Sequence, residues 1–456
     1  MTMSTRMSWV CAVLIGGAAL LSLSACSDST DVGLGVGPGS DSLKGGKPVT
    51  VDVLPDLDTT RTPPITGENF RRASSRSTWR VLTGIVDDPI PGTGTIETEG
   101  YVDFAGRSTL PSQIISADNA DSLAAELRLT TNYLHGASGE PMEVKVYNLT
   151  AEAEMDSARA NAGFDADETD PASVTTAQII PTDSLVTIEL RQSWIDEHLT
   201  TLQDTSDGGS GFEDNFSGFK IIAPNSEAVV GFSAANAALR LTHTPDSVTA
   251  DYPALKTFTH IEQRNVTASP SDDYELMVGG IGVGLTMNWN FDENPLDSLA
   301  TAPLNRAEIF VPADTLAMAD FPGSNFVRPL PNGYRVIATR TSDAPPCTAV
   351  RLPVFSPTNE ACVLPLLPSA PRGVALVSDN VAFPIFQQSF QRVRNGRSPL
   401  FRTYRVRVAD RDSASVDQAS TIQPGLPSTL PVLIQRPSST QGEVAPPRAT
   451  LTVTPL

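Results

Sequence analysis

Positive charge is scarce in this chain. Its 456 residues include 32 Lys and Arg against 52 Asp and Glu, which gives a formal net charge of −20. Binding to nucleic acid depends largely on Lys and Arg contacts to phosphates. The deficit therefore argues against a nucleic-acid partner and against tight binding to anionic lipid headgroups. We expect the acidity to serve solubility.

Long hydrophobic runs are also missing, except at the N-terminus. There Arg6 precedes an apolar run from Trp9 to Leu21, and Leu23-Ser24-Ala25-Cys26 follows. The run is shorter than the roughly 20 apolar residues of a spanning helix. A charged start, an apolar core and small residues at the end are typical of a secretory signal. The Leu-Ser-Ala-Cys sequence resembles the lipobox of bacterial lipoproteins, which implies a signal peptide over residues 1–25 and lipidation of Cys26. The alternative is an ordinary signal peptide with an incidental cysteine.

The segment after Cys26 is rich in Gly, Ser and Asp as far as Gly46. Such a composition buries too little apolar surface to offset the entropy of ordering, so we expect a flexible tether over residues 26–65. Asp28 and Asp31 follow the cysteine closely. They resemble the acidic surface-export signal of Bacteroidota lipoproteins and favour the cell surface. The periplasmic face of the outer membrane is the alternative.

Cysteine is rare, with four in the chain. Cys11 leaves with the signal peptide and Cys26 is lipidated, so Cys347 and Cys362 remain. In an exported protein these two favour a disulfide. The bridge would close a loop of about 15 residues, worth roughly 3 kcal/mol in the chain-entropy model. Free thiols are the alternative, and no CxxC pattern indicates a metal site.

Histidine is scarce as well, and the usual catalytic patterns are missing. His135, His198, His243 and His260 form no HExxH or HxH pair, so zinc is not indicated. No GxSxG elbow indicates a serine hydrolase. We expect the histidines to be surface or packing residues, and we expect no catalytic residue, metal or cofactor. A glycosidase pair of carboxylates stays open by count alone.

Helical periodicity is rare, whereas short runs of alternating apolar and polar residues are common. Such a period of two predicts strands with one buried face. Turn residues separate the runs, and His135 to Gly139 is predicted as a hairpin loop. Two short helices are predicted, over 191–203 and 385–393; in the first, an apolar stripe contains Trp194, Ile195, His198, Leu199 and Leu202. The clearest strand runs are 79–83, 125–129, 143–147, 185–190 and 334–340.

A weak internal duplication suggests two modules. Each opens with an alternating strand, places one short helix before its last strands, and closes with a strand, at 237–242 and 449–454. Many short strands of this kind favour a sandwich or barrel. We therefore predict an all-β fold of two tandem β-sandwich, jelly-roll-like modules with short helices. The predicted boundaries are 66–245 for the first module, 246–272 for a linker and 273–456 for the second.

Three stretches together resemble an uncharacterised Bacteroidota lipoprotein family, labelled domain of unknown function 4270. They are residues 81–104 (VLTGIVDDPIPGTGTIETEGYVDF), 120–130 (ADSLAAELRLT) and 142–150 (MEVKVYNLT). Within the first, the matching positions are Gly84, Asp88, Pro89 and Gly92; the second has one extra residue before its alternation begins. The resemblance covers most of the mature chain. It implies an outer-membrane or surface lipoprotein of β-sandwich type, and it implies no catalytic residues.

Three further signals are weak. Gly279 to Gly284 lies between strand-like residues rather than in a βαβ unit, so nucleotide binding is not indicated. The acidic run from Asp165 to Asp170 offers oxygen ligands for calcium but lacks the glycine and final glutamate of an EF-hand loop. We expect a solvated loop there. Trp79, Trp194, Trp289 and Tyr101 could stack on sugars if exposed, but core packing is the expectation.

These observations favour a lipid-anchored outer-membrane or cell-surface lipoprotein that binds, adheres or assembles without catalysis. Its expected partners are the membrane, through the N-terminal lipid, and other envelope proteins or glycans. The alternatives are a glycan-binding module that assists polysaccharide capture and a secreted hydrolase. No ligand, oligomeric state or membrane face follows from the residues.

Overall fold

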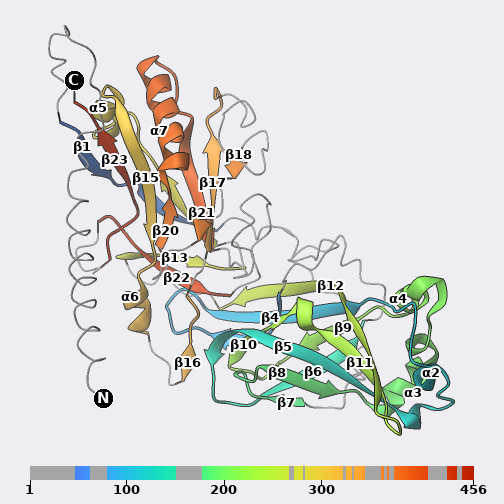
Figure 1. Ribbon diagram of the computed structural model, residues 1–456. Helices are drawn as coiled ribbons and strands as arrows, with labels where there is room; N and C mark the ends of the chain where they lie inside the picture. Colours follow the sequence, from blue (N-terminus) through green and yellow to red (C-terminus); the bar gives the residue numbers. More distant parts are fainter. Residues whose placement is uncertain are drawn as a thin grey trace, which may run out of the picture. The chain divides into compact units, whose positions relative to one another are not determined.

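A computed structural model describes most of the chain between Lys47 and Pro455. The described residues are 47–61, 80–149, 177–265, 272–280, 283–321, 325–330, 333–344, 361–363, 367–368, 374–408, 429–438 and 444–455. Their fold is mostly β, with several antiparallel sheets and short helices (Figure 1). This confirms the sequence-based expectation in its coarse form. None of the helices in these ranges is long and apolar enough to cross a membrane.

The largest sheet has eleven strands in the described residues. Its main order is β12-β11-β5-β10-β3-β4-β9-β6-β7, while β8 and β16 pair with β5. Strand β12 pairs with β11 over its first part and with β4 over its second, so it joins two ladders. The bounds are β3 Arg80–Asp87, β4 Thr95–Phe104, β5 Leu123–Ala137, β6 Met142–Asn148, β7 Ala177–Ile179, β8 Leu185–Glu189, β9 Phe219–Ile222, β10 Ala228–Ser233, β11 Ala238–His243, β12 Val248–Arg264 and β16 Phe326–Val327.

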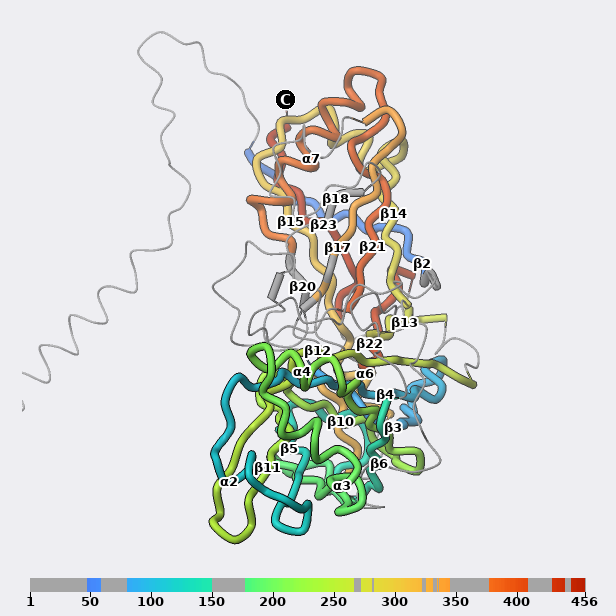
Figure 2. The backbone as a smooth tube through the Cα atoms, turned by 90° about the vertical axis from the view of Figure 1, so that its right-hand side faces the viewer, coloured from blue at the N-terminus to red at the C-terminus, as the bar shows by residue number. Residues whose placement is uncertain are grey.

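Two smaller sheets are built mainly from the second half of the chain. One has the order β1-β23-β15-β20, and the other has β18-β17-β21-β14-β13-β22 with β19 on β17 and β2 on β14. Figure 2 shows β23 beside β15, as their pairing requires. The bounds are β1 Val49–Val53, β2 Asp56–Arg61, β13 Tyr274–Val278, β14 Val283–Asn288, β15 Leu304–Pro312, β17 Gly333–Arg340, β18 Ala361–Val363, β19 Leu367–Pro368, β20 Val374–Val377, β21 Phe401–Val408, β22 Pro431–Gln435 and β23 Arg448–Val453.

The helices are short, apart from α3 (Gln192–Leu202) and α7 (Asp379–Arg394). Both were predicted, although α7 begins six residues earlier than the periodicity of 385–393 indicates. The apolar stripe of α3 buries Trp194, Ile195 and Leu202. The other α-helices in the described ranges are α2 Ser112–Ile115, α4 Ser210–Asn215, α5 Leu296–Ala300 and α6 Thr315–Ala319.

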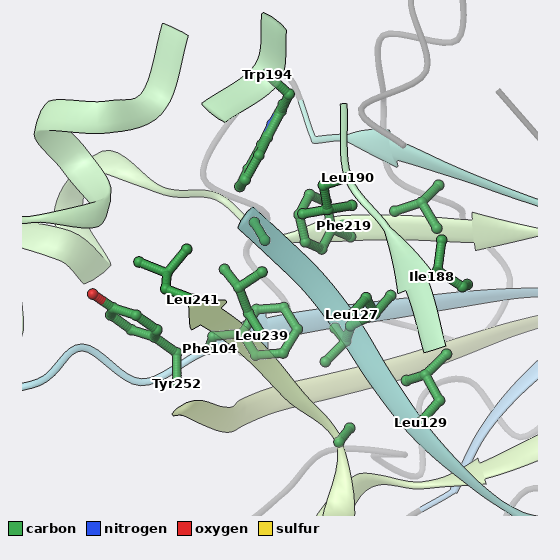
Figure 3. Close-up of a cluster of buried hydrophobic side chains, with 14 of the residues drawn as sticks. Phe104, Leu127, Leu129, Ile188, Leu190, Trp194, Phe219, Leu239, Leu241 and Tyr252 are labelled. Carbon is green, nitrogen blue, oxygen red and sulfur yellow. The ribbon is translucent and has the colours of Figure 1, made fainter. Parts of the chain in front are cut away.

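Alternation along the strands creates the hydrophobic cores. On β5, Leu123, Ala125, Leu127 and Leu129 are buried, because every second side chain points to the same face. Figure 3 shows part of this first core, where Phe104, Leu239 and Tyr252 lie with side chains from β5, β8 and α3. A second core packs α7 against the smaller sheets. A third cluster combines Leu82 and Val86 of β3 with Leu276 of β13 and Leu433 of β22.

The structure differs from the predicted domain boundaries in two places. The predicted linker 246–272 contains β12, a 17-residue strand whose alternating side chains Ala250, Tyr252 and Ala254 are buried. The predicted tether 26–65 contains β1 and β2, which pair with β23 and β14. Both segments pair with neighbouring strands and bury apolar side chains. They therefore belong to the sheets and are not connections between modules.

Candidate functional site

The predicted site residues fall mostly outside the described part of the chain. Cys26 and Cys347 lie outside it, as do Trp79 and the acidic run 165–170. Cys362 lies in β18, where the backbone alone is described. In the described residues, no group of three or more His, Cys, Asp or Glu side chains could hold a metal ion.

A buried polar cluster brings together four side chains that are far apart in the sequence. They are Asp88 in the turn between β3 and β4, His135 on β5, Arg328 just after β16 and Thr429 just before β22. The His135 Nε2 lies 2.8 Å from Asp88 Oδ2, and His135 Nδ1 lies 2.9 Å from Thr429 Oγ1. We call these four residues the buried polar cluster.

The turn that holds Asp88 follows from its local sequence. Pro89 cannot donate a backbone hydrogen bond, and Asp88 Oδ1 accepts from the amide of Ile90 at 2.9 Å. Thr93 then donates to the carbonyl of Ile90, and Gly92 takes a φ of 89°, in the left-handed region. The side chain of Asp88 is thereby directed away from its own strand and toward His135.

Arg328 neutralises the buried carboxylate. Its Nε donates to Asp88 Oδ2 and its Nη2 to Asp88 Oδ1, both at 2.9 Å, while Nη1 donates to the carbonyl of Met318 at 2.8 Å. Burial alone would raise the pKa of Asp88, but the hydrogen bonds from His135 and Arg328 outweigh it and lower that pKa. Asp88 is therefore a carboxylate that can only accept hydrogen bonds.

The chemistry of the acceptor fixes the histidine tautomer. Because the Asp88 carboxylate has no proton to give, His135 Nε2 carries a proton and donates it to Asp88. In a neutral ring Nδ1 then accepts from the Thr429 hydroxyl. The amide of Thr429 donates to the Tyr133 hydroxyl at 3.1 Å, and that hydroxyl lies 3.2 Å from Thr429 Oγ1.

An aligned carboxylate, imidazole and hydroxyl are the parts of a nucleophilic catalytic triad. Here the side chains of Asp88 and His135 are fully buried, and Thr429 is also 0% exposed. The ring of Phe326 stands edge-on to His135, with centroids 5.6 Å apart and planes at 89°. A molecule from outside therefore has no access to the hydroxyl, and the buried polar cluster cannot act on an external substrate in this conformation.

A second set of charges lies on one face of β4, β9 and β12. Glu99 Oε1 lies 2.8 Å from Lys220 Nζ, and Glu99 Oε2 lies 3.3 Å from His260 Nδ1 and accepts from the Tyr101 hydroxyl at 2.6 Å. The strand register places these side chains together, because Glu99 is opposite His260 and Tyr101 is opposite Lys220. The set continues along β4 and β12 to Glu97, Glu262 and Arg264. We call the six charged or ionisable residues the charged strip: Glu97, Glu99, Lys220, His260, Glu262 and Arg264.

The inner end of the charged strip is strongly ionised. Burial would raise the pKa of Glu99, but hydrogen bonds from His260, Lys220 and Tyr101 and the charge of Lys220 lower it to about 2. The outer end is open to solvent. There the Arg264 side chain is 54% exposed and contacts Glu97 and Glu262, each at 2.9 Å. The strip therefore offers a surface partner fixed charges of both signs.

Sequence reasoning missed both groups. His135 was predicted in a hairpin loop, and that prediction is wrong, because β5 continues through His135 to Ala137. Gly136 allows the backbone of Glu227 to come close to β5 and does not form a turn, since a Cβ at Gly136 would lie 2.4 Å from the carbonyl oxygen of Glu227. Asp88 is one of the positions that match the family pattern, and this match is the one feature of the sequence that points to the buried polar cluster. Nothing near Thr429 in the sequence indicates its contact with His135.

Three of the four aromatic residues considered as sugar platforms lie in cores, and the fourth, Trp79, is outside the described residues. Tyr101 is 0% exposed, Trp194 4% and Trp289 1%. His198 stacks on Trp194, with ring centroids 4.6 Å apart. Core packing, the expected role of these aromatic residues, is confirmed for all three.

No protein-family model matches the chain, and no curated protein matches it. Among solved structures, it has a distant likeness to the nodavirus of Macrobrachium rosenbergii. The two are 11% identical over 93% of this chain and 94% of that chain, with a TM-score of 0.12. That score is too low to support an argument about fold or function, and the family resemblance stays a prediction.

Proposed function

We propose that this protein is a lipid-anchored lipoprotein of the outer membrane, on the cell surface, which binds or assembles with other envelope proteins without catalysis. The lipobox-like Leu-Ser-Ala-Cys sequence and the acidic residues after Cys26 support the address. The resemblance to the Bacteroidota lipoprotein family, with its sandwich or jelly-roll modules, supports the same assignment. A disulfide between Cys347 and Cys362 belongs to this proposal, because the protein would mature outside the cytoplasm.

The observation that carries the non-enzymatic role is the complete burial of the Asp88, His135 and Thr429 side chains. In this array the imidazole lies between a carboxylate and a hydroxyl, as in a catalytic triad, and a hydrolase needs its nucleophile open to substrate. The arrangement instead neutralises charge and satisfies hydrogen bonds inside the fold. It therefore favours a structural role for these three residues over catalysis on an external molecule.

A protein partner is favoured over a glycan by the kind of side chain on the surface. The large hydrophobic residues that are exposed in the described part of the chain are all aliphatic. Sugar recognition by stacking needs exposed aromatic rings. The glycan-binding alternative therefore has no platform among these residues. The charged strip, by contrast, suits a polar protein surface of complementary charge, since such pairs give specificity.

Photo-cross-linking on intact cells tests this function by comparing the wild type with a variant at Arg264. Replacing Arg264 with Glu puts three like charges side by side at the exposed end of the charged strip, and we expect cross-linking to envelope proteins to fall about tenfold. Arg306→Glu is the matched control, because Arg306 is 58% exposed and also pairs with a glutamate two residues away, Glu308. Equal yields from wild type and both variants would remove the charged strip from the proposal. Mobility shifts in polysaccharide gels would support the glycan alternative instead.

A further inference from the structure

Strand β1 lies at one end of the four-stranded sheet β1-β23-β15-β20 (Figure 1). Among the described residues it pairs with β23 alone, and the register runs without a shift from Val49 opposite Val453 to Val53 opposite Ala449. The backbone groups on its other edge therefore have no strand partner in the part of the chain that the structure describes. Such an edge is a template for pairing with a further strand.

The sequence of β1 does not protect this edge. Proteins block exposed edges with lysine, proline, a bulge or a very short strand, whereas residues 49–53 read VTVDV and pair with β23 without a bulge. Val49 is 46% exposed, and Leu54, which follows the strand, is 48% exposed. The strand carries one charge, that of Asp52. The edge therefore suits an extended partner strand that brings apolar side chains.

The two faces of β1 have different surroundings. Val53 is buried in the second core and Val51 packs against that core, so Val49 points to the same face by alternation. Thr50 and Asp52 point to the opposite face, and both are exposed. A strand that extends the sheet must match this alternation, with apolar side chains on the core face and polar ones on the other.

Strand β1 of a second copy meets these requirements. In an antiparallel pair centred on Val51, Val49 of each copy is opposite Val53 of the other, and Thr50 is opposite Asp52. Pairs of β-branched residues directly opposite one another stabilise a sheet, and a threonine hydroxyl can donate to a carboxylate. The strand is therefore complementary to itself in this register.

Charge and proline disfavour the neighbouring registers. A centre at Asp52 would put the two carboxylates face to face and bring Pro55 into the ladder opposite Val49. A centre at Thr50 would bring Pro48 into the ladder opposite Asp52, and proline cannot donate a ladder hydrogen bond. A centre between two residues would set core-facing side chains opposite solvent-facing ones.

We propose that two copies of this chain associate through β1, which joins their four-stranded sheets into one antiparallel sheet across a twofold axis. The contact is isologous, because each copy contributes the same strand. It does not involve the charged strip, so it adds a second copy of the chain to the partners of the proposed function. Five paired residues bury less surface than a standard protein interface, and we expect a weak, reversible dimer.

Disulfide trapping in the purified mature chain tests the pairing. Val51→Cys puts two thiols opposite each other at the twofold axis, where facing Cα atoms are about 4.5–5.5 Å apart, a separation that a disulfide spans. We expect mild oxidation to convert most of this variant to a covalent dimer. Leu54→Cys is the control, because its two exposed thiols would be about 20 Å apart, six residues along the pair. The wild type gives the background from its native cysteines.

Two substitutions at Thr50 test the same contact through charge. Both remove the contact between Thr50 Oγ1 and Thr452 Oγ1, 3.0 Å apart at the surface, so the variants differ mainly in charge. Thr50→Asp sets a second carboxylate opposite Asp52 at two places in the dimer, and we expect sedimentation equilibrium to show a dissociation constant about tenfold higher. Thr50→Lys sets an opposite charge there and should dimerise at least as well as the wild type.

Two results would overturn the proposal. One is Val51→Cys that is folded by circular dichroism but is trapped no better than Leu54→Cys. The other is equal dimerisation of Thr50→Asp and Thr50→Lys, which would move any self-association to another surface. Neither result depends on Arg264, so the dimer and the proposed role of the charged strip can fail separately.

Discussion

Asp88 and Arg328 are 240 positions apart in the chain, yet they form a two-point ion pair with both contacts at 2.9 Å. The Asp88 side chain is fully buried and that of Arg328 is 11% exposed. The pair joins the turn between β3 and β4 to the segment after β16. It is therefore a contact on which the placement of that segment depends.

Asp88→Asn should destabilise the protein strongly. The substitution leaves the Arg328 guanidinium without its counter-charge in a buried site, and breaking such a pair costs about 3–5 kcal/mol. Urea unfolding measures the loss. Asp292→Asn is the control, because Asp292 pairs with Arg402 at 2.6 Å but is 64% exposed. That variant should lose less than about 1 kcal/mol, and equal losses in the two variants would contradict this role of Asp88.

Stability should depend on pH through Glu99. Its pKa of about 2 lies below the unfolded value of 4.5, so the folded state gains stability above pH 4.5 and loses that gain as pH falls toward 2. The shift corresponds to at most about 3 kcal/mol, reduced by solvent because the side chain is 23% exposed. Unfolding free energies of wild type and Glu99→Gln should differ most near pH 6 and converge near pH 2. A constant difference would show that Glu99 does not titrate in this way.

Gly84 should tolerate no side chain. A Cβ there would lie 2.1 Å from the carbonyl oxygen of Ala228, and the φ of Gly84 is 120°. Gly396→Ala is the control, because Gly396 has open space around it and a φ of 66°, within the left-handed region that other residues also adopt. We expect Gly396→Ala to cost about 1 kcal/mol from the backbone alone. Gly84→Ala should cost at least about 2 kcal/mol more, from the clash and from its less accessible φ together. Thermal unfolding measures the difference, and similar melting temperatures would refute the close approach.

The disulfide prediction has a direct chemical readout. Alkylation of the unfolded protein without reductant should modify neither Cys347 nor Cys362, and reduction should expose both. The double Cys→Ser variant should be less stable by about 3 kcal/mol if the loop-entropy model applies. Two alkylatable thiols in freshly purified wild type would end the prediction.

The sequence predicts the local elements well because they depend on alternation and periodicity. The strands over 125–129 and 143–147 and the buried stripe of α3 lie where those patterns place them. Long-range placement was out of reach. Nothing in residues 49–61 indicates pairing with β23 and β14, since edge strands carry few constraints beyond alternation.

The buried polar cluster shows the same limit. The Asp88-Pro89 turn could be anticipated from local chemistry, whereas its partners His135, Arg328 and Thr429 come from three other segments. Each of the three is unremarkable within its own stretch of sequence. They contact one another and Asp88 only when the sheets bring β5, β16 and β22 together.

The central claim is that a lipidated Cys26 holds this β-rich body on the membrane. The most direct test is the mass of the N-terminal peptide of the protein purified from its native envelope. The account predicts a chain that begins at Cys26 with acyl groups on that residue, and a Cys26→Ala variant that leaves the membrane fraction. A peptide that still carries residues 1–25, or an unmodified Cys26 thiol, would contradict it.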